Sequence, residues 1–351
     1  MQEPLLKIEN LSVQFFSGEN VFQAVRDVSL DLFPAETLAL VGESGSGKSV
    51  TALSVLRLLP PAETNYTSGR IVFDAEDILI LNERRLRNIR GNRVGVVFQE
   101  PLSSLNPLHS VEKQISEVLF LHKGMRPNQA RKRVLELLEL VGIKDAPARL
   151  GSYPHELSGG QRQRVMIAMA LAAEPDLLIA DEPTTALDVT VQNQVMDLLK
   201  RLQKQMGMAI LFITHDLAVV RNFADRVAVM YQGRIVETAP TRQLFTNPVH
   251  DYTRMLIEAE PHGAPVSPYK SKQTLLKTKD LKVWFPITKG ILKRTVDYFK
   301  AVNGISLKVI YGRSLGIVGE SGSGKTTLGM ALLRLNRSRG VIWIDGRRID
   351  V

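Results

Sequence analysis

The feature that most constrains this chain is residues 42–49, Gly-Glu-Ser-Gly-Ser-Gly-Lys-Ser, which follow the apolar run 38–41. The segment fits the pattern G-x-x-x-x-G-K-[ST] of a phosphate-binding loop. Backbone N–H groups can surround a triphosphate only where side chains are absent, which explains Gly42, Gly45 and Gly47. The alternative is a Gly/Ser-rich turn between a strand and a helix, but both the spacing and the flanking residues favour phosphate binding.

Two residues at the end of this loop have expected roles in binding. Lys48 is expected to reach the β- and γ-phosphates, and the Ser49 hydroxyl is expected to ligate Mg²⁺. A helix that opens at Ser49 would direct the positive end of its dipole toward the anion. The expected nucleotide contacts of this loop are Gly42, Glu43, Ser44, Gly45, Ser46, Gly47, Lys48, Ser49 and Val50.

The loop is part of an internal repeat. Residues 317–326, Ile-Val-Gly-Glu-Ser-Gly-Ser-Gly-Lys-Thr, match it at an offset of 277, whereas residues 275–283 match residues 5–13 at an offset of 270. The second copy therefore gained seven residues, around the basic stretch 289–294. Its expected nucleotide contacts are Gly319, Gly322, Gly324, Lys325 and Thr326.

The repeat predicts the domain organisation. We expect a first domain over residues 1–260 with a helical insertion at about 100–173, a linker over 261–273, and the opening fragment of a second domain over 274–351. Short strands are expected over 5–41, and strands that are apolar on both faces indicate a parallel sheet covered by helices. The remaining expected elements are helices over 48–59, 111–122, 127–141, 159–173, 190–206 and 251–258, strands over 69–73, 93–98, 177–180 and 209–213, and a hairpin over 227–238.

Composition excludes several classes of protein. The 351 residues contain no cysteine, which removes disulfides, zinc-thiolate sites and iron–sulfur clusters, and the six histidines show no metal-ligand spacing. No run of 18 apolar residues and no secretory signal occurs, so we expect a cytoplasmic chain.

The net charge of +9 is unevenly distributed. Residues 262–351 carry 17 Lys and Arg against 5 Asp and Glu, and residues 1–261 carry 28 against 31. Neither interleaved aromatic residues nor a basic recognition helix accompanies the basic end, so we expect no nucleic-acid partner. A solvated surface, or one that faces anionic lipid or an acidic remainder, explains the charge better.

A second motif identifies a family. Residues 157–161, Leu-Ser-Gly-Gly-Gln, place a serine N-cap and two glycine N–H groups at the start of a helix, which makes another anion site. This pentapeptide is the signature sequence of ABC transporter ATP-binding subunits, which the chain resembles. The resemblance implies a head-to-tail dimer with two ATP molecules between the domains, in which Ser158, Gly159, Gly160 and Gln161 contact the ATP held by the partner.

The same resemblance assigns the remaining site residues. Residues 177–182 resemble the Walker B strand: Asp181 would hold Mg²⁺, and Glu182 would polarise the attacking water. His215 matches the switch histidine that contacts the γ-phosphate. Gln99 matches the Q-loop glutamine, which senses Mg²⁺ and the attacking water. Residues 186–188 resemble the D-loop with Asp188 at the dimer seam, and Phe15, or its neighbour Phe16, would stack on adenine as the A-loop aromatic.

These motifs imply a fold class and a function. The expected fold is an α/β P-loop NTPase of the ABC ATPase type, with a parallel-sheet core, an antiparallel β subdomain and a helical subdomain, followed by an incomplete second copy. Residues 98–107 and 247–254 resemble segments of oligopeptide and dipeptide importer ATPases, although Asp251 replaces the usual proline of their His-Pro-Tyr. The chain is therefore expected to hydrolyse ATP with Mg²⁺ and to energise peptide import, including microcin C-like peptides, across the bacterial inner membrane.

The expected partners and location follow from the same resemblance. Transmembrane permease subunits would be direct partners, a periplasmic peptide-binding protein an indirect one, and the chain would lie peripherally on the cytoplasmic face of the membrane. In this sequence the second copy lacks a Q-loop, signature, Walker B and switch histidine, so ATP is expected to bind at the first loop and to be hydrolysed slowly unless two chains pair. Two alternatives are a truncated, hydrolysis-deficient nucleotide-binding fragment and a non-transport ABC ATPase. The second alternative predicts long insertions between Gln99 and Ser158, and this interval is short.

Overall fold

The computed structural model describes residues 3–18, 20–185, 188–259, 273–289, 294–320 and 322–350. It divides into two compact units, one made of residues 1–187 and 191–261 and the other of residues 188–190 and 262–351. The linker expected over 261–273 lies, except for Gln273, outside the described residues. No helix in the described part of the chain is both long enough and apolar enough to cross a membrane.

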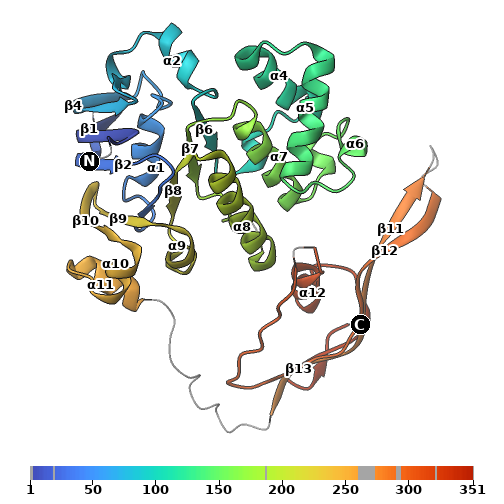
Figure 1. Cartoon of the computed structure of the whole chain (residues 1–351). Coiled ribbons are helices and arrows are strands. Elements are labelled where there is room, and N and C mark those ends of the chain that lie inside the picture. Colours follow the sequence, from blue (N-terminus) through green and yellow to red (C-terminus); the bar gives the residue numbers. More distant parts are fainter. Residues whose placement is uncertain are drawn as a thin grey trace. The chain divides into compact units, whose positions relative to one another are not determined.

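A six-stranded sheet forms the centre of the first unit (Figure 1). Five of its strands are parallel, and the edge strand β10 is antiparallel to β9. The strand order is β10 (Arg234–Pro240), β9 (Arg226–Tyr231), β3 (Thr37–Val41), β8 (Ala209–Thr214), β7 (Leu177–Asp181) and β6 (Val94–Val97).

The central strands are buried on both faces. Every residue of β3 is buried; Leu38 and Leu40 belong to one hydrophobic cluster, whereas Ala39 and Val41 belong to another. Side chains alternate across a sheet, so successive residues of one strand supply both clusters. This explains the unbroken apolar runs that the sequence analysis interpreted as parallel strands.

Helices cover the central sheet and form a separate lobe. Each expected helix of this unit is present, and all but the first have only small shifts at their ends. The helices are α1 (Lys48–Ser54), α2 (Glu83–Ile89), α3 (Pro101–Ser104), α4 (Val111–Lys123), α5 (Pro127–Leu140), α6 (Ala146–Arg149), α7 (Gly159–Leu171), α8 (Val189–Met206), α9 (Leu217–Phe223), α10 (Thr241–Thr246) and α11 (Asp251–Glu258), with the 3₁₀ turns η1 (Ile78–Ile80) and η2 (Pro154–Glu156).

The helix predicted over 48–59 is shorter than expected. It ends at Ser54 rather than before Pro60, and Arg57 has a left-handed backbone with φ of 50°. The Arg57 guanidinium donates a hydrogen bond to the Leu81 carbonyl at 2.7 Å. This long-range bond accompanies a turn that local helical spacing does not predict.

An antiparallel sheet accompanies the central one, with strand order β2 (Asn20–Leu32), β1 (Leu6–Ser17), β4 (Thr64–Phe73) and β5 (Glu76–Asp77). The pairing of β1 with β4 extends β4 back to Thr64, five residues before the predicted start. A register shift interrupts this pairing near Asn10, which has φ of 51°. The Asn10 N–H donates to Ser29 Oγ at 2.9 Å, so a side chain satisfies an amide that the shift leaves outside the ladder.

The second unit repeats the antiparallel sheet. Its strands are β12 (Arg294–Ile305), β11 (Thr274–Lys289), β14 (Arg339–Ile344) and β15 (Arg347–Arg348), in the order of β2, β1, β4 and β5, with β13 (Lys308–Ile310) also paired to β11. Asp280 has φ of 49° and donates its N–H to Ser306 Oγ at 3.0 Å, as Asn10 does to Ser29. The sequence repeat is thus also a structural repeat, and the helix after its loop is α12 (Lys325–Leu332).

One element of the repeat is missing. Residues 313–320, which correspond to β3 and the start of its loop, have no regular secondary structure, and Val318 is 93% exposed. In the first unit β3 is hydrogen-bonded between β8 and β9, which come from residues 209–231. Among the described residues of the second unit, no strand pairs with this segment.

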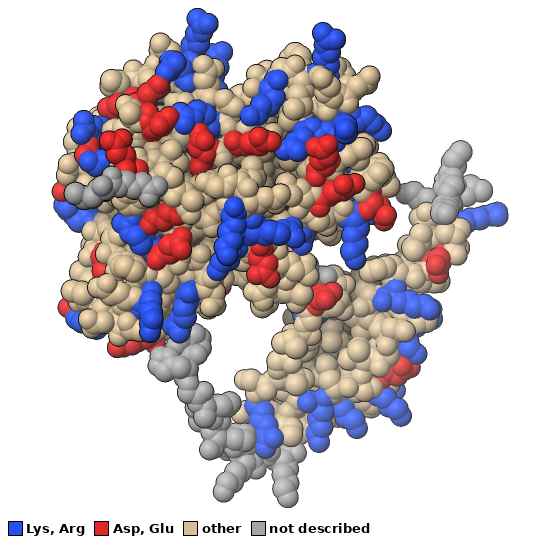
Figure 2. Space-filling model, in the orientation of Figure 1, with Lys and Arg blue, Asp and Glu red and all other residues tan. Residues whose placement is uncertain are grey.

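The surface charge differs between the units. In Figure 2, Lys and Arg are mixed with Asp and Glu over the first unit, whereas the visible surface of the second unit carries mainly Lys and Arg. This agrees with the 17 basic and 5 acidic residues of positions 262–351.

Candidate functional site

A cavity of about 740 Å³ lies where the central strands of the first unit end. Loops at the carboxyl ends of parallel strands are the usual place for a ligand site in α/β folds. Its lining residues come from the antiparallel sheet, the phosphate loop and the ends of β6, β7 and β8. They are Phe15, Phe22, Ala24, Glu43, Ser44, Gly45, Gly47, Lys48, Ser49, Val50, Gln99, Glu182, Thr185 and His215.

The loop between β3 and α1 has the backbone that its glycines predict. Gly42, Gly45 and Gly47 have φ of 150°, 79° and 104°. A Cβ atom on Gly42 would lie 2.1 Å from the Met230 carbonyl oxygen, and one on Gly47 would lie 2.6 Å from that of Ala24. The backbone angles favour glycine at all three positions, and close packing also requires it at Gly42 and Gly47. The loop forms a cradle that fits a polyphosphate.

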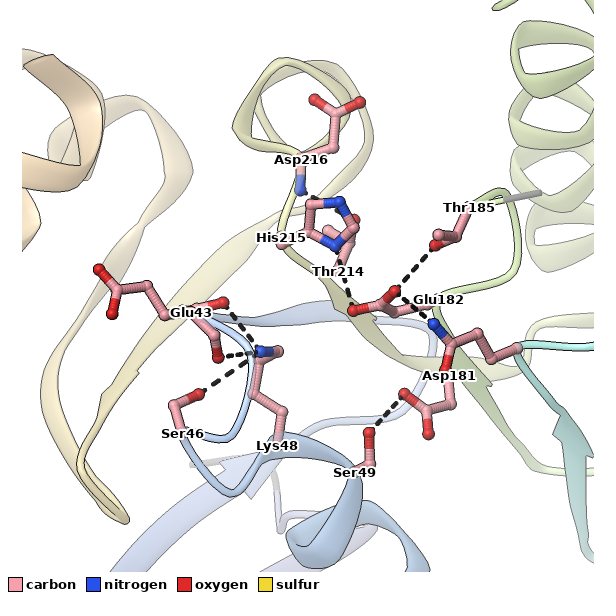
Figure 3. A network of polar contacts seen from close by, with 12 residues as sticks. Glu43, Ser46, Lys48, Ser49, Asp181, Glu182, Thr185, Thr214, His215 and Asp216 are labelled. Carbon is pink, nitrogen blue, oxygen red and sulfur yellow. Dashed lines mark hydrogen bonds and ion pairs between the residues drawn. The ribbon is translucent and has the colours of Figure 1, made fainter. Parts of the chain in front are cut away.

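Lys48 is buried under this loop (Figure 3). Its Nζ donates hydrogen bonds to the carbonyl oxygens of Gly42 and Glu43, each at 2.8 Å, and lies 3.4 Å from Ser46 Oγ. Burial lowers the pKa of Lys48, and the nearby carboxylates of Glu182 and Asp181 partly oppose this effect. The ammonium group is thus held at the base of the cradle with both acidic residues nearby.

Asp181 and Ser49 form an oxygen pair beside Lys48. The Ser49 hydroxyl donates to Asp181 Oδ1 at 3.1 Å, and Asp181 is buried at the end of β7. Burial raises the pKa of Asp181, whereas the hydrogen bond from Ser49 lowers it less strongly. A hydroxyl and a carboxylate are ligands that suit Mg²⁺, which completes its coordination with water and phosphate oxygens. The described residues contain no cluster of three His, Cys, Asp or Glu that could hold a metal alone.

Glu182 is the centre of a second polar cluster, drawn in Figure 3. Its Oε2 accepts hydrogen bonds from Gln99 Nε2 at 2.9 Å and from Thr185 Oγ1 at 2.8 Å, and its Oε1 lies 3.1 Å from His215 Nδ1. Burial alone would raise the pKa of Glu182, but the hydrogen bonds from His215 and Thr185 outweigh it, so the pKa is lowered. An ionised carboxylate held in this way can orient a water molecule.

The aromatic residue expected at the cavity is present. Phe15 lines the cavity, whereas its neighbour Phe16 is 42% exposed and does not. Phe15 also packs against the hydrophobic core, so it has both a structural and a pocket-lining position. Phe22 pairs with Phe15 across β1 and β2 and lines the cavity as well.

Phe22, Ala24 and Thr185 also line the cavity, although no sequence motif assigned them to the site. Phe22 reaches the cavity because the antiparallel register of β1 and β2 sets it opposite Phe15, and this register is visible only in the structure. Thr185 lies three residues after Glu182, and its hydroxyl donates to that carboxylate. The hydroxyl residues that follow Asp181 and Glu182 in the sequence could have suggested it.

The signature residues lie outside this cavity. Ser158 caps α7: its Oγ accepts the Gln161 N–H at 3.3 Å, and its own N–H donates to Gln161 Oε1 at 3.0 Å. Gly160 packs against α8, where an added Cβ would lie 2.8 Å from Val191 Cγ1. Ser158, Gly159, Gly160 and Gln161 thus form a helix start separate from the phosphate loop. Asp188 is described and does not line the cavity; Ala186 and Leu187 are outside the described residues.

The second phosphate loop keeps its local geometry without a parallel sheet like the one that carries the first loop. Gly319, Gly322 and Gly324 have φ of 155°, 81° and 92°, close to the values in the first loop. Lys325 Nζ donates to the carbonyl oxygens of Gly319 and Glu320 at 2.6 and 2.7 Å, and α12 carries Lys325 and Thr326 at its start. Unlike Lys48, Lys325 is not buried.

The sequence profile of the ABC transporter family matches residues 25–185 and 302–351. The chain is 57% identical over 348 residues to the peptidoglycan transport ATP-binding protein YejF of Agrobacterium fabrum, which covers 99% of this chain and 64% of that protein. It is 43% identical over 378 residues to the glutathione import ATP-binding protein GsiA of Escherichia coli K12, covering 99% of this chain and 61% of that protein. The chain thus spans less than two thirds of the length of these two relatives.

A solved structure is also similar. The dimeric structure of a post-hydrolysis state of the ATP-binding cassette MJ0796, bound to ADP and Pi, aligns with a TM-score of 0.61 and 32% sequence identity. The match covers 68% of this chain and 99% of that one. The α/β architecture predicted from the sequence is thereby confirmed as that of an ATP-binding cassette.

Proposed function

The chain belongs to the ABC transporter family, and from this premise we propose that it is an ATP-binding and ATP-hydrolysing subunit that energises peptide import across the bacterial inner membrane. We further propose that residues 1–260 form the working ATPase domain and that residues 274–351 are the beginning of a second one. The cargo class is proposed from the importer-like segments and from the relatives, of which one is named for peptidoglycan transport and another for glutathione import.

One observation carries the proposal. The phosphate loop, Asp181 beside Ser49, and the cluster of Gln99, Glu182 and His215 all meet at one end of the central sheet. These groups come from four separate strand ends, and together they supply a phosphate cradle, a Mg²⁺ site and a carboxylate for water. Phosphoryl transfer needs these parts because its catalysis rests on positioning and on stabilising charge.

We assign a role to each group. The amides of the glycine loop and Lys48 would bind the phosphates; Ser49, Asp181 and Gln99 would hold Mg²⁺. Bound Mg²⁺ would neutralise the charge of the phosphates and fix their orientation. Glu182 would polarise the attacking water, with His215 and Thr185 keeping its carboxylate ionised and oriented.

The adenine contact is assigned by position. Phe15 would stack on the base, and Phe22 lies opposite it on the neighbouring strand. Aromatic faces suit a purine ring because the contact buries a large apolar area.

The site requires a partner. The signature residues Ser158, Gly159, Gly160 and Gln161, with Asp188, would contact ATP held by a second ATPase domain in a head-to-tail dimer. We propose that two chains pair through their first units, because each first unit carries both a phosphate loop and a signature helix start. An unpaired chain would bind ATP at the first site and hydrolyse it slowly.

The proposed location and partners follow from the transport role. The subunit would lie on the cytoplasmic face of the inner membrane, bound to transmembrane permease subunits and served indirectly by a periplasmic peptide-binding protein. If pairing requires a complete second domain, this chain would bind ATP without hydrolysing it.

ATP hydrolysis and transport by the chain with its permeases test the proposal. We expect Glu182→Gln to retain MgATP binding. Its hydrolysis rate should fall by about two orders of magnitude or more, which is the loss seen when an active site loses one charge-stabilising group. Unchanged hydrolysis in Glu182→Gln would remove Glu182 from the mechanism. Hydrolysis without any response to permease or peptide would favour a non-transport ATPase.

A further inference from the structure

The start of α11 makes a direct contact with the phosphate loop. Tyr252, in the first turn of α11, is only 6% exposed, and its hydroxyl oxygen accepts the backbone N–H of Glu43 at 3.1 Å. The two residues are 209 positions apart. None of the roles described above uses Tyr252.

The peptide group that Tyr252 holds is also the one that holds Lys48. The carbonyl of Gly42 and the N–H of Glu43 belong to one planar peptide unit, so fixing one end fixes the other. Tyr252 binds the N–H end, and Lys48 Nζ donates to the carbonyl end at 2.8 Å. The Tyr252 hydroxyl and the Lys48 ammonium therefore hold opposite ends of the same peptide unit.

Packing around Tyr252 makes its ring rigid. The ring stacks on Tyr231, with centroids 4.1 Å apart and planes at 29°. Tyr231 ends β9 directly after Met230, whose carbonyl oxygen lies against Gly42. The end of β9 thus supports both the glycine and the tyrosine.

The start of α11 is fixed as well. Glu237 on β10 accepts the N–H groups of Val249 and His250, both at 2.9 Å, and His250 Nδ1 accepts the Tyr252 N–H at 3.1 Å. Three backbone amides at the helix start are thereby satisfied by side chains. These bonds fix the backbone from which the Tyr252 side chain reaches the loop.

We propose that Tyr252 is a positioning residue for the phosphate loop, acting through the Gly42–Glu43 peptide on Lys48 and so on MgATP affinity. The proposal rests on the proposed function, because it assumes that the loop binds ATP. Removing the hydroxyl leaves a half-buried amide without its partner, and a lost hydrogen bond of this kind costs about 0.5–1.5 kcal/mol. We therefore expect Tyr252→Phe to bind MgATP about 2- to 12-fold more weakly.

The test compares Tyr252→Phe with Tyr231→Phe in the full chain. The Tyr231 hydroxyl contacts the side chain of Gln232 at 3.1 Å, so its removal keeps the stacked ring and spares the loop. MgATP affinity is measured by calorimetry, and hydrogen exchange of the Glu43 amide is measured without nucleotide. Tyr252→Phe should weaken affinity and speed this exchange, and Tyr231→Phe should change neither.

The two readouts separate the possible failures. If Tyr252→Phe matches the parent in affinity or in Glu43 exchange, or only lowers the melting temperature, the positioning role is wrong. If Tyr231→Phe has the same effects, ring stacking rather than the hydroxyl is responsible, and the role is equally wrong. If the parent chain does not bind MgATP, the proposed function fails, whereas the exchange comparison still tests the Tyr252 contact.

Discussion

His215 Nδ1 lies 3.1 Å from Glu182 Oε1, although 33 positions separate the two residues. They follow β7 and β8, adjacent parallel strands in which Asp181 is paired with Ile213. The Glu182 backbone continues this register by donating its N–H to the Ile213 carbonyl at 2.9 Å, with φ of 45°. The sheet thus brings an acid and an imidazole together at the edge of the cavity.

This contact predicts how stability depends on pH. Because the pKa of Glu182 lies below 4.5, the ionised carboxylate stabilises the folded state, and this stabilisation is complete above pH 4.5 and lost as the pH falls through the lowered pKa. We expect the melting temperature of the parent to fall more steeply than that of Glu182→Gln between about pH 5 and pH 3. Glu117→Gln, at an exposed position on α4, is the control. Parallel curves for the parent and Glu182→Gln would contradict the prediction.

Asp181 predicts the opposite effect on the protein without nucleotide. Burial raises the pKa of Asp181, so its ionised form destabilises the folded state as the pH rises through the folded pKa. Asp181→Asn should raise the melting temperature without nucleotide at pH 7 by about 2–4 °C, the shift typical of 1 kcal/mol in a domain of this size. The added stabilisation by MgATP should decrease in the same variant. A lower melting temperature of Asp181→Asn without nucleotide would show that the ionised Asp181 carboxylate does not destabilise the folded state.

The two phosphate loops are expected to differ in importance. Lys48→Ala removes a buried ammonium and should weaken MgATP binding about 10- to 150-fold, the range of one charge-assisted hydrogen bond of about 1.5–3 kcal/mol. Lys325→Ala is the matched control, because Lys325 makes the same loop contacts but is not buried. Calorimetric titration of both variants measures the difference. Equal losses would mean that both loops bind the nucleotide.

Pairing of two chains can be tested by mixing inactive variants. Lys48→Ala lacks a working phosphate loop and Ser158→Arg lacks a working signature, so each should hydrolyse ATP poorly alone. A mixed dimer has one intact composite site, made of Lys48 from one chain and Ser158 from the other. Random pairing should restore about one quarter of the parent rate, since about half of the dimers are mixed. No recovery in a mixture that still dimerises would exclude this arrangement.

Two glycines in one loop should differ in tolerance. A Cβ atom on Gly42 would lie 2.1 Å from the Met230 carbonyl oxygen, whereas one on Gly45 meets nothing within 4 Å. Both substitutions strain the backbone by about 1–2 kcal/mol, but only Gly42→Ala also displaces β9. Thermal unfolding should therefore show a larger loss for Gly42→Ala. Equal losses would indicate that the backbone angle alone sets the cost.

Much of the fold could be predicted from local patterns. The glycine spacing predicted a loop whose φ values are positive in both copies, and Ser158 predicted the start of α7. The end of α1 could not be predicted, because Arg57 bonds to the carbonyl of Leu81, 24 positions away. The absence of a strand over 313–320 was also unpredicted, since a run that resembles β3 becomes a strand only beside partners such as β8 and β9.

The sequence by itself determined the phosphate cradle, the repeat and the residue types of the site. The glycine angles and the loop's own carbonyls are enough to place the lysine, because the second loop makes the same lysine contacts without a parallel sheet. In the first loop, Met230 and Tyr252 add contacts from residues far along the sequence. Only the tertiary structure decided which side chains meet: Ser49 with Asp181, Glu182 with Gln99 and His215, and Tyr252 with Glu43. Those contacts join residues 33 to 209 positions apart, and their geometry depends on the order and register of strands, which no local pattern specifies.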